Sequence, residues 1–90
     1  MKIEHYPEQQ LFVYVNEAGQ QAGRLRYRFI SADKIDVFST VVEPAFQGKG
    51  IAGELYAAMI AFVQQQQCKV KPSCSYIEKR MERSHPDLIA

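Results

Sequence analysis

The chain has 90 residues, of which 47% are hydrophobic and 23% charged, and its formal net charge is +1. This length and balance predict a single domain, residues 1–90, and argue against a disordered chain. The near-neutral charge gives no reason to expect nucleic acid as a partner. No apolar run approaches the roughly 20 residues that a bilayer-spanning helix needs, so we expect no membrane association.

The cysteine content and the N-terminus indicate a cytoplasmic protein. The two cysteines, Cys68 and Cys74, are too few for a disulfide framework, and no cluster has the spacing of metal ligands. The first residues lack the apolar stretch of a signal peptide. We therefore expect reduced thiols, no bound metal and a monomer or weak dimer in the cytoplasm.

The first half of the chain predicts antiparallel strands. Leu11–Val15 is β-branched and aromatic, which is typical of a strand, and Asn16–Gly19 is a turn. Gln21–Ile30 alternates apolar and polar residues, which predicts a strand with one buried face. The polar face carries Arg24, Arg26 and Arg28. We expect this arginine face to be solvated, although it could also bind an anionic partner.

The next segments predict a central strand and a helix. Ile35–Val42 has apolar residues on both faces, which predicts a central strand covered on both sides. From Ile51 to about Gln65 the apolar residues recur with the period of a helix and form a broad stripe that packs on the sheet. Cys68–Lys71 is a short strand, which a right-handed crossover would place parallel to the central strand.

The end of the chain predicts a second helix. Ser75–Glu78 has the Ser-x-x-Glu pattern of a capping box, and the helix extends from Tyr76 to about Ser84. Its polar residues, Arg80 among them, are expected to face solvent. The fold class is therefore α+β, an α/β sandwich with a mixed, mostly antiparallel sheet and two helices.

A glycine loop between the central strand and the first helix predicts a phosphate site. Gly48-Lys49-Gly50 precedes a helix whose first N–H groups have no partner within the helix, and Lys49 adds a positive charge. Gly48, Gly50 and Gly53 also fit the spacing of a dinucleotide fingerprint. That fingerprint belongs to a βαβ unit, however, and here it follows antiparallel strands. A strand-to-helix turn that merely requires glycine is the remaining alternative.

Cys74 is a second candidate for a site. It stands just before the second helix and past the end of the short parallel strand, so it should share a sheet edge with the glycine loop. A helix N-terminus stabilises a thiolate, which makes Cys74 a candidate nucleophile. The alternative is a buried cysteine that serves as a small apolar residue, and this is the interpretation that we favour for Cys68.

Two motifs resemble one family. Gln47-x-x-Gly50-x-Ala52, preceded by Val42-x-Pro44, resembles the acetyl-CoA signature Gln/Arg-x-x-Gly-x-Gly/Ala of the GNAT superfamily of N-acyltransferases. With Pro72-Ser73-Cys74-Ser75-Tyr76 downstream, the chain is similar to the small stand-alone GNAT-like proteins. The resemblance implies a truncated GNAT-like fold that binds acetyl-CoA or CoA. The binding residues so implied are Val41, Val42, Gln47, Gly48, Lys49, Gly50, Ile51 and Ala52.

The resemblance also implies catalytic roles. A backbone N–H at about Val41 or Val42 would polarise the thioester carbonyl. Glu43 is the nearest carboxylate for a base, although a surface glutamate is the alternative. Cys74 could accept the acetyl group or line the thioester pocket. Tyr76 could protonate the departing CoA thiolate, or it could simply pack in the first helical turn.

One departure from the family concerns the base. Relatives often have histidine followed by threonine where this chain has Ser39-Thr40. We expect the two histidines, His5 and His85, to be surface residues. The predicted function is acetyl-CoA-dependent N-acetyltransfer to an unidentified amine. The alternative is a CoA- or acyl-CoA-binding module without efficient catalysis, and a third, weaker interpretation is an interaction domain that presents its arginine face.

Overall fold

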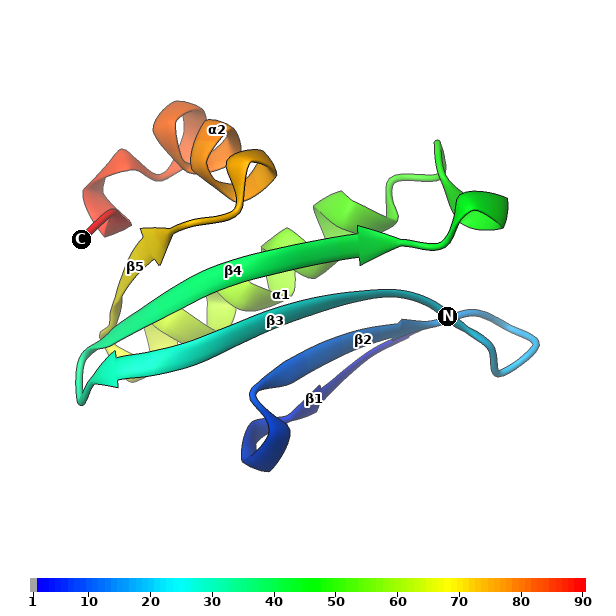
Figure 1. The fold of residues 1–90 in the computed structure, drawn as a ribbon, viewed down its shortest axis with the longest axis horizontal. Helices are drawn as coiled ribbons and strands as arrows, with labels where there is room; N and C mark the ends of the chain where they lie inside the picture. Colours follow the sequence, from blue (N-terminus) through cyan, green and yellow to red (C-terminus); the bar gives the residue numbers. More distant parts are fainter. Residues whose placement is uncertain (1) are drawn as a thin grey trace.

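A computed structural model describes residues 2–90 and shows one five-stranded sheet in the order β1-β2-β3-β4-β5 (Figure 1). Neighbouring strands are antiparallel except β4 and β5, which are parallel. The strands are β1 (Lys2–Tyr6), β2 (Leu11–Val15), β3 (Gln21–Ser31), β4 (Lys34–Val42) and β5 (Lys69–Pro72). The helices are α1 (Ile51–Gln66) and α2 (Ser75–Ser84), with short 3-10 turns at Pro7–Gln9, Pro44–Phe46 and Pro86–Leu88. This is the predicted α+β fold.

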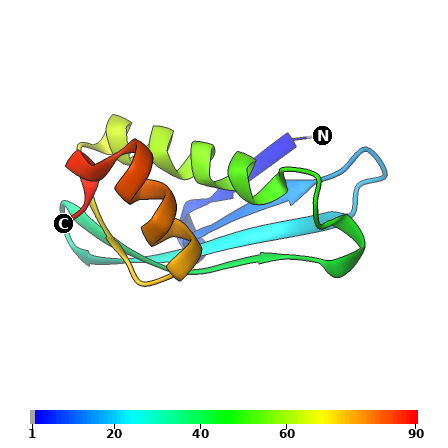
Figure 2. The same cartoon turned by 90° about the horizontal axis from the view of Figure 1, so that it is seen from above.

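Both helices pack on the same face of the sheet (Figure 2). The apolar stripe of α1 is confirmed, because its residues from Ile51 to Val63 meet the inner face of the sheet in one core cluster. α2 adds Ile77 and Met81 to the same core. No helix within residues 2–90 is long and apolar enough to cross a membrane.

The strand β1 was not predicted from the sequence. Its only strongly apolar residue is Ile3, so tertiary pairing and not local pattern decides its conformation. Ile3 lies opposite Tyr14, and the His5 ring stacks on Phe12 with ring centroids 4.1 Å apart. The His5 Nε2 lies 2.6 Å from the Tyr27 hydroxyl. His5 is therefore half-buried, which corrects the expectation of a surface residue.

The prediction that β4 is covered on both faces is wrong. Phe38 is an extra residue in a β-bulge, because Arg26 pairs with Ser39 and Tyr27 pairs with Val37. Phe38 points outward, and the bulge shifts the alternation after it, so Val41 also lies on the outer face; these side chains are 43% and 38% exposed because both helices pack on the other face (Figure 2). The arginines of β3 share this face, and Arg28 lies over the Phe38 ring, 5.4 Å from its centroid.

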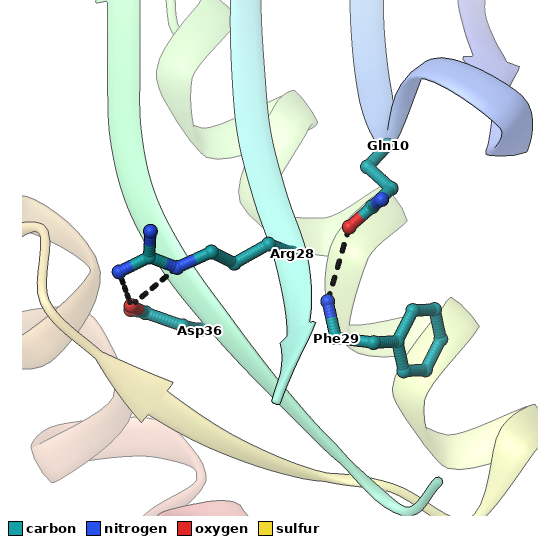
Figure 3. A network of polar contacts seen from close by, with 4 residues as sticks. All are labelled: Gln10, Arg28, Phe29 and Asp36. Carbon is teal, nitrogen blue, oxygen red and sulfur yellow. Dashed lines mark hydrogen bonds and ion pairs between the residues drawn. The ribbon is translucent and has the colours of Figure 1, made fainter. Parts of the chain in front are cut away.

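One buried carboxylate lies on the outer face of β4. Asp36 is 1% exposed, and its Oδ2 accepts hydrogen bonds from two nitrogens of Arg28 at 3.0 and 3.3 Å (Figure 3). The neighbouring Ser73 hydroxyl and then the Arg28 guanidinium hold the pKa of Asp36 below its usual value, against the burial that would raise it. In the same view the Gln10 side chain accepts the Phe29 N–H at 3.0 Å. These contacts join β3 to β4 and to the turn that precedes β2.

The parallel pairing of β4 and β5 is confirmed, and it is short. The last strand pair is Val37 with Pro72, after which the Cys74 N–H donates to the Val37 carbonyl at 3.0 Å. Among residues 2–90, no strand pairs with the rest of β4 on that side. The two parallel strands therefore separate where α2 begins, and they leave the end of β4 with an open edge.

The predicted capping box at Ser75 does not form. α2 begins at Ser75 itself, Cys74 is the N-cap residue, and no side chain caps this end of the helix. The reason is the hydrogen bond from the Cys74 N–H to Val37, which ties this residue to the end of the sheet pairing. The helix consequently starts one residue earlier than its capping pattern indicates.

Candidate functional site

The glycine loop joins the end of β4 to α1 in a conformation that requires its glycines. Gly48 and Gly50 have φ of +82° and +79°, in the left-handed region that side chains disfavour. Gly50 is the N-cap of α1, and no side chain caps this helix either. The first helical hydrogen bond runs from the Glu54 N–H to the Gly50 carbonyl, so the N–H groups of Ile51 to Gly53 have no partner within the helix.

The space around the loop fits a phosphate group. Within residues 2–90, no atom outside each glycine and its two chain neighbours lies within 4 Å of the position that a Cβ would take at Gly48 or at Gly50. An anion can therefore approach the main chain closely, at the positive end of the α1 dipole.

A cavity of about 340 Å³ lies between the loop, the first turn of α1 and the start of α2. It brings together most of the residues that the sequence selects. They are Val42, Gln47, Gly48, Gly50, Ile51, Ala52 and Tyr76, and Phe46, Gly53 and Arg80 complete the lining. Lys49 instead lines a neighbouring cavity of about 430 Å³ with Glu17 and Glu54, on the side of the β2–β3 turn.

The open edge of β4 points main-chain groups toward this site. The Glu43 N–H donates to Ala22 on β3 at 2.9 Å. Because N–H groups alternate along a strand, the Val42 N–H points to the opposite side, where β5 has ended. The Gln47 side chain donates to the Val42 carbonyl at 3.2 Å from that side. The Val41 side chain lies on the outer face of the sheet, away from the cavity.

Cys74 lies beside the middle of this edge. Its Sγ is 3.6 Å from the Thr40 Oγ1, across the gap where β4 and β5 separate. The thiol is half-buried and free of any disulfide. Cys68 is different, because it is 3% exposed and forms part of the core. Burial, with a smaller contribution from Asp33, raises the pKa of the Cys68 thiol, as expected for a packing residue.

The candidate general bases do not contact Cys74. Glu43 forms an ion pair with Arg24 at 3.0 Å, and its side chain is 42% exposed. His85 is half-buried, and its Nδ1 lies 2.8 Å from the Tyr56 hydroxyl, so it is also not the surface residue that the sequence predicts. His5 belongs to the aromatic cluster under β1. None of these three groups has a hydrogen bond or an ion pair to Cys74 within residues 2–90.

Arg80 differs from its expected position. The sequence predicts that it faces solvent, but it is half-buried and lies over the Tyr56 ring, 4.7 Å from the centroid. Its Nη1 donates to the Tyr76 hydroxyl at 3.0 Å. That nitrogen is also 3.3 Å from the position of a Cβ on Gly53. Gly53 therefore makes room for Arg80, which explains the third glycine without a dinucleotide fingerprint.

Two members of this site were missed in the sequence, Thr40 and Arg80. The i, i+4 spacing of Tyr76 and Arg80 is a signal that could have found the second. No local signal marks Thr40, since its contact with Cys74 depends on where β5 ends. Within residues 2–90, no three histidine, cysteine or acidic side chains are grouped as metal ligands would be.

Comparison with known proteins gives a consistent result. A family model described as GCN5-related N-acetyl-transferase matches residues 10–89. Protein NATD1 of Danio rerio is 27% identical over 90 residues, covering 99% of this chain and 82% of that protein. The solution structure of a GCN5-like protein from Staphylococcus aureus has a TM-score of 0.77 at 21% identity, covering 99% and 87% of the two chains. A GNAT family acetyltransferase from Elizabethkingia anophelis, solved with acetyl-CoA bound, has a TM-score of 0.63 at 15% identity, covering 83% and 51%.

Proposed function

The chain belongs to the GCN5-related N-acetyltransferase family, and we propose that it binds acetyl-CoA at the glycine loop and transfers the acetyl group to an amine. One observation supports this most strongly. The cavity is lined by the glycine loop, by the first turn of α1 with its unpaired N–H groups, and by Val42 at the end of β4, while Cys74 and Thr40 lie outside this lining, farther back along β4. Acetyl-CoA has an anionic diphosphate, which suits the loop end of the cavity, and a thioester, which would extend from Val42 along the open edge of β4 toward Cys74.

Different residues along the site would bind the diphosphate and the thioester of acetyl-CoA. The N–H groups that follow Gly50 would bind the diphosphate, as helix N-termini do. The Val42 N–H, on the open edge, would donate to the oxygen of the thioester carbonyl, where negative charge develops during acyl transfer. Acetyl-CoA itself would supply the activated acetyl group.

Cys74 would stand at the reacting end. Its sulfur would bond to the acetyl carbon while the carbon–sulfur bond to CoA breaks, and the thiol proton would pass to the departing CoA sulfur. A neutral amine would then attack the acetyl carbon, the bond from that carbon to the Cys74 sulfur would break, and a proton of the amine would pass to the sulfur and restore the thiol. The Tyr76 hydroxyl accepts a hydrogen bond from Arg80 and lies 4.0 Å from the position of a Cβ on Gly53, so it would lie at the diphosphate end of the ligand and not beside the departing CoA sulfur.

A second function is favoured by the absence of a placed base. Glu43 is paired with Arg24, and both histidines are bonded to tyrosines, so no general base is in hydrogen-bond contact with Cys74 among the described residues. A module that binds acetyl-CoA or CoA without efficient transfer would need no such base. In that case Cys74 would line the thioester end and would not be acylated.

The test is a heteronuclear NMR titration with acetyl-CoA, followed by intact mass spectrometry. We expect chemical-shift changes concentrated at residues 47–52 and near Cys74. An adduct of about 42 Da, the mass that one acetyl group adds, should form on the protein and be lost in Cys74→Ala. Cys68→Ala is the matched control, since it removes the other thiol and should keep the adduct.

The outcomes separate the candidates. Binding with the adduct, followed by acetylation of an added amine, supports the transferase. Binding without an adduct and without turnover supports the binding module. If millimolar acetyl-CoA causes no shifts in the loop, both proposals are wrong and the arginine face becomes the feature to pursue.

A further inference from the structure

We infer that Arg80 is a ligand of the CoA diphosphate, and that this side chain is held in place for that purpose by two tyrosine rings and by the absence of a side chain at Gly53. The inference rests on the proposed function, because it concerns the same cavity and the same ligand. It assigns the phosphate contact to α2, an element that contributes no residue to the glycine signature.

Contacts with neighbouring side chains fix the orientation of the Arg80 side chain. Its guanidinium lies over the Tyr56 ring at 4.7 Å, and its Nη1 donates to the Tyr76 hydroxyl at 3.0 Å. The Tyr56 hydroxyl is fixed in turn by Ser84 at 2.7 Å and by His85 at 2.8 Å. A planar guanidinium held in this way keeps its remaining N–H groups in a fixed direction, which reduces the entropy that a ligand contact would cost.

Among residues 2–90, no acidic side chain forms an ion pair with Arg80. The ion pairs within residues 2–90 are Lys2–Glu4, Arg24–Glu43 and Arg28–Asp36, and none includes Arg80. A half-buried cation beside a cavity, stabilised only by aromatic rings and a phenol, favours an anionic ligand. The cavity is where that anion can lie, since Arg80 forms part of its lining.

The geometry selects the diphosphate among the phosphates of CoA. Gly53 is the third residue of α1, and the Arg80 Nη1 would be 3.3 Å from a Cβ placed there. The guanidinium therefore lies beside the first turn of the helix, whose free N–H groups bind phosphate oxygens. One anion can accept hydrogen bonds from the Arg80 guanidinium and from these N–H groups at the same time. This arrangement is expected for the diphosphate and not for a phosphate on the ribose.

The test compares three ligands by isothermal titration calorimetry. They are CoA, 3′-dephospho-CoA, and acetyl-pantetheine, which has no diphosphate. Hydrogen bonds to charged groups are worth about 1.5–3 kcal/mol, so Arg80→Gln should raise the Kd of CoA and of 3′-dephospho-CoA by roughly tenfold or more, and by the same factor. Binding of acetyl-pantetheine should not change. The wild-type affinity for CoA should also fall more steeply with salt than that of the variant.

Two further variants control for charge and for folding. Arg83→Gln removes the same charge from an exposed position of the same helix and should bind CoA like the wild type. Arg80→Lys keeps the charge but loses the planar fork, and it should bind with intermediate affinity. If the thermal melt shows that Arg80→Gln is unfolded, the lysine variant carries the test.

Three results would overturn the inference. Wild-type affinity for CoA in a folded Arg80→Gln would show that the residue is not a ligand, while the proposed function would stand. A loss that disappears with 3′-dephospho-CoA would place Arg80 on the ribose phosphate instead. Failure of the wild-type protein to bind CoA at all would refute the proposed function itself.

Discussion

Gly48→Ala should separate the backbone strain of the loop from its role in binding. Gly48 has a φ of +82°, and no atom lies within 4 Å of the position of an added Cβ, so the substitution meets no clash. The left-handed conformation costs an alanine roughly 1–2 kcal/mol, and the stiffer unfolded chain returns about 0.4–1 kcal/mol. We expect a net loss of about 1 kcal/mol, or a fall in Tm of about 4–8 °C for a domain of this size.

Gly19 provides the matched control. It lies in the β2–β3 turn with a φ of +80° and the same open surroundings, but it is not part of the candidate cavity. Gly19→Ala and Gly48→Ala should therefore lower the Tm by similar amounts in circular dichroism melts. Only Gly48→Ala should weaken acetyl-CoA binding in calorimetry, by about tenfold, because its methyl group occupies the approach to the loop amides. Equal affinity in the two variants would refute the reasoning.

Three other changes test the framework around the site. Asp36→Asn should make the free energy of unfolding less dependent on pH in the acid range. In the wild type, the carboxylate stabilises the fold fully above its ordinary pKa of 3.8, and this contribution is lost as the pH falls through the lowered pKa of the folded state. Burial lowers the pKa of His5 in the folded chain, so the unfolded chain takes up a proton at a higher pH than the folded chain does. Wild-type stability should therefore decrease as the pH falls below 6.5, and His5→Phe should remove this decrease. Tyr56→Phe deletes the hydroxyl that meets Ser84 and His85 and should cost about 1 kcal/mol in urea unfolding at pH 7. Parallel pH profiles of variant and wild type would contradict the first two predictions, and an unchanged urea midpoint would contradict the third.

The strands and helices with a strong local period were predictable, and those that depend on partners were not. The bounds of β2 and the start of α1 agree with the sequence prediction, because alternation and the helical stripe are local properties. β1 was missed because its pairing with β2 supplies what its composition lacks. The prediction that β4 is covered on both faces was wrong because both helices pack on one face of the sheet (Figure 2), and the apolar pattern of a strand does not tell whether an element covers its second face.

The same distinction applies to the candidate site. Glycines at positive φ, followed by a helix, form a contiguous signature, so the loop could be read from the chain. The contact of Cys74 with Thr40 joins residues 34 positions apart and follows from where two parallel strands separate. The sequence predicts a solvent-facing Arg80, because a charged residue on a short helix usually faces water. Its actual place depends on Tyr56, a residue of the other helix.

The open end of β4 has a consequence for the behaviour of the protein in solution. β4 is an interior strand of the sheet, between β3 and β5, yet its last residues present unpaired main-chain groups, as an edge strand does. Such an edge invites a strand from another molecule, which is a route to aggregation. The Gln47 side chain bonded to the Val42 carbonyl and the Cys74 turn over Thr40 obstruct that approach. If this edge binds acetyl-CoA as proposed, the same two groups would both line the ligand and oppose self-association.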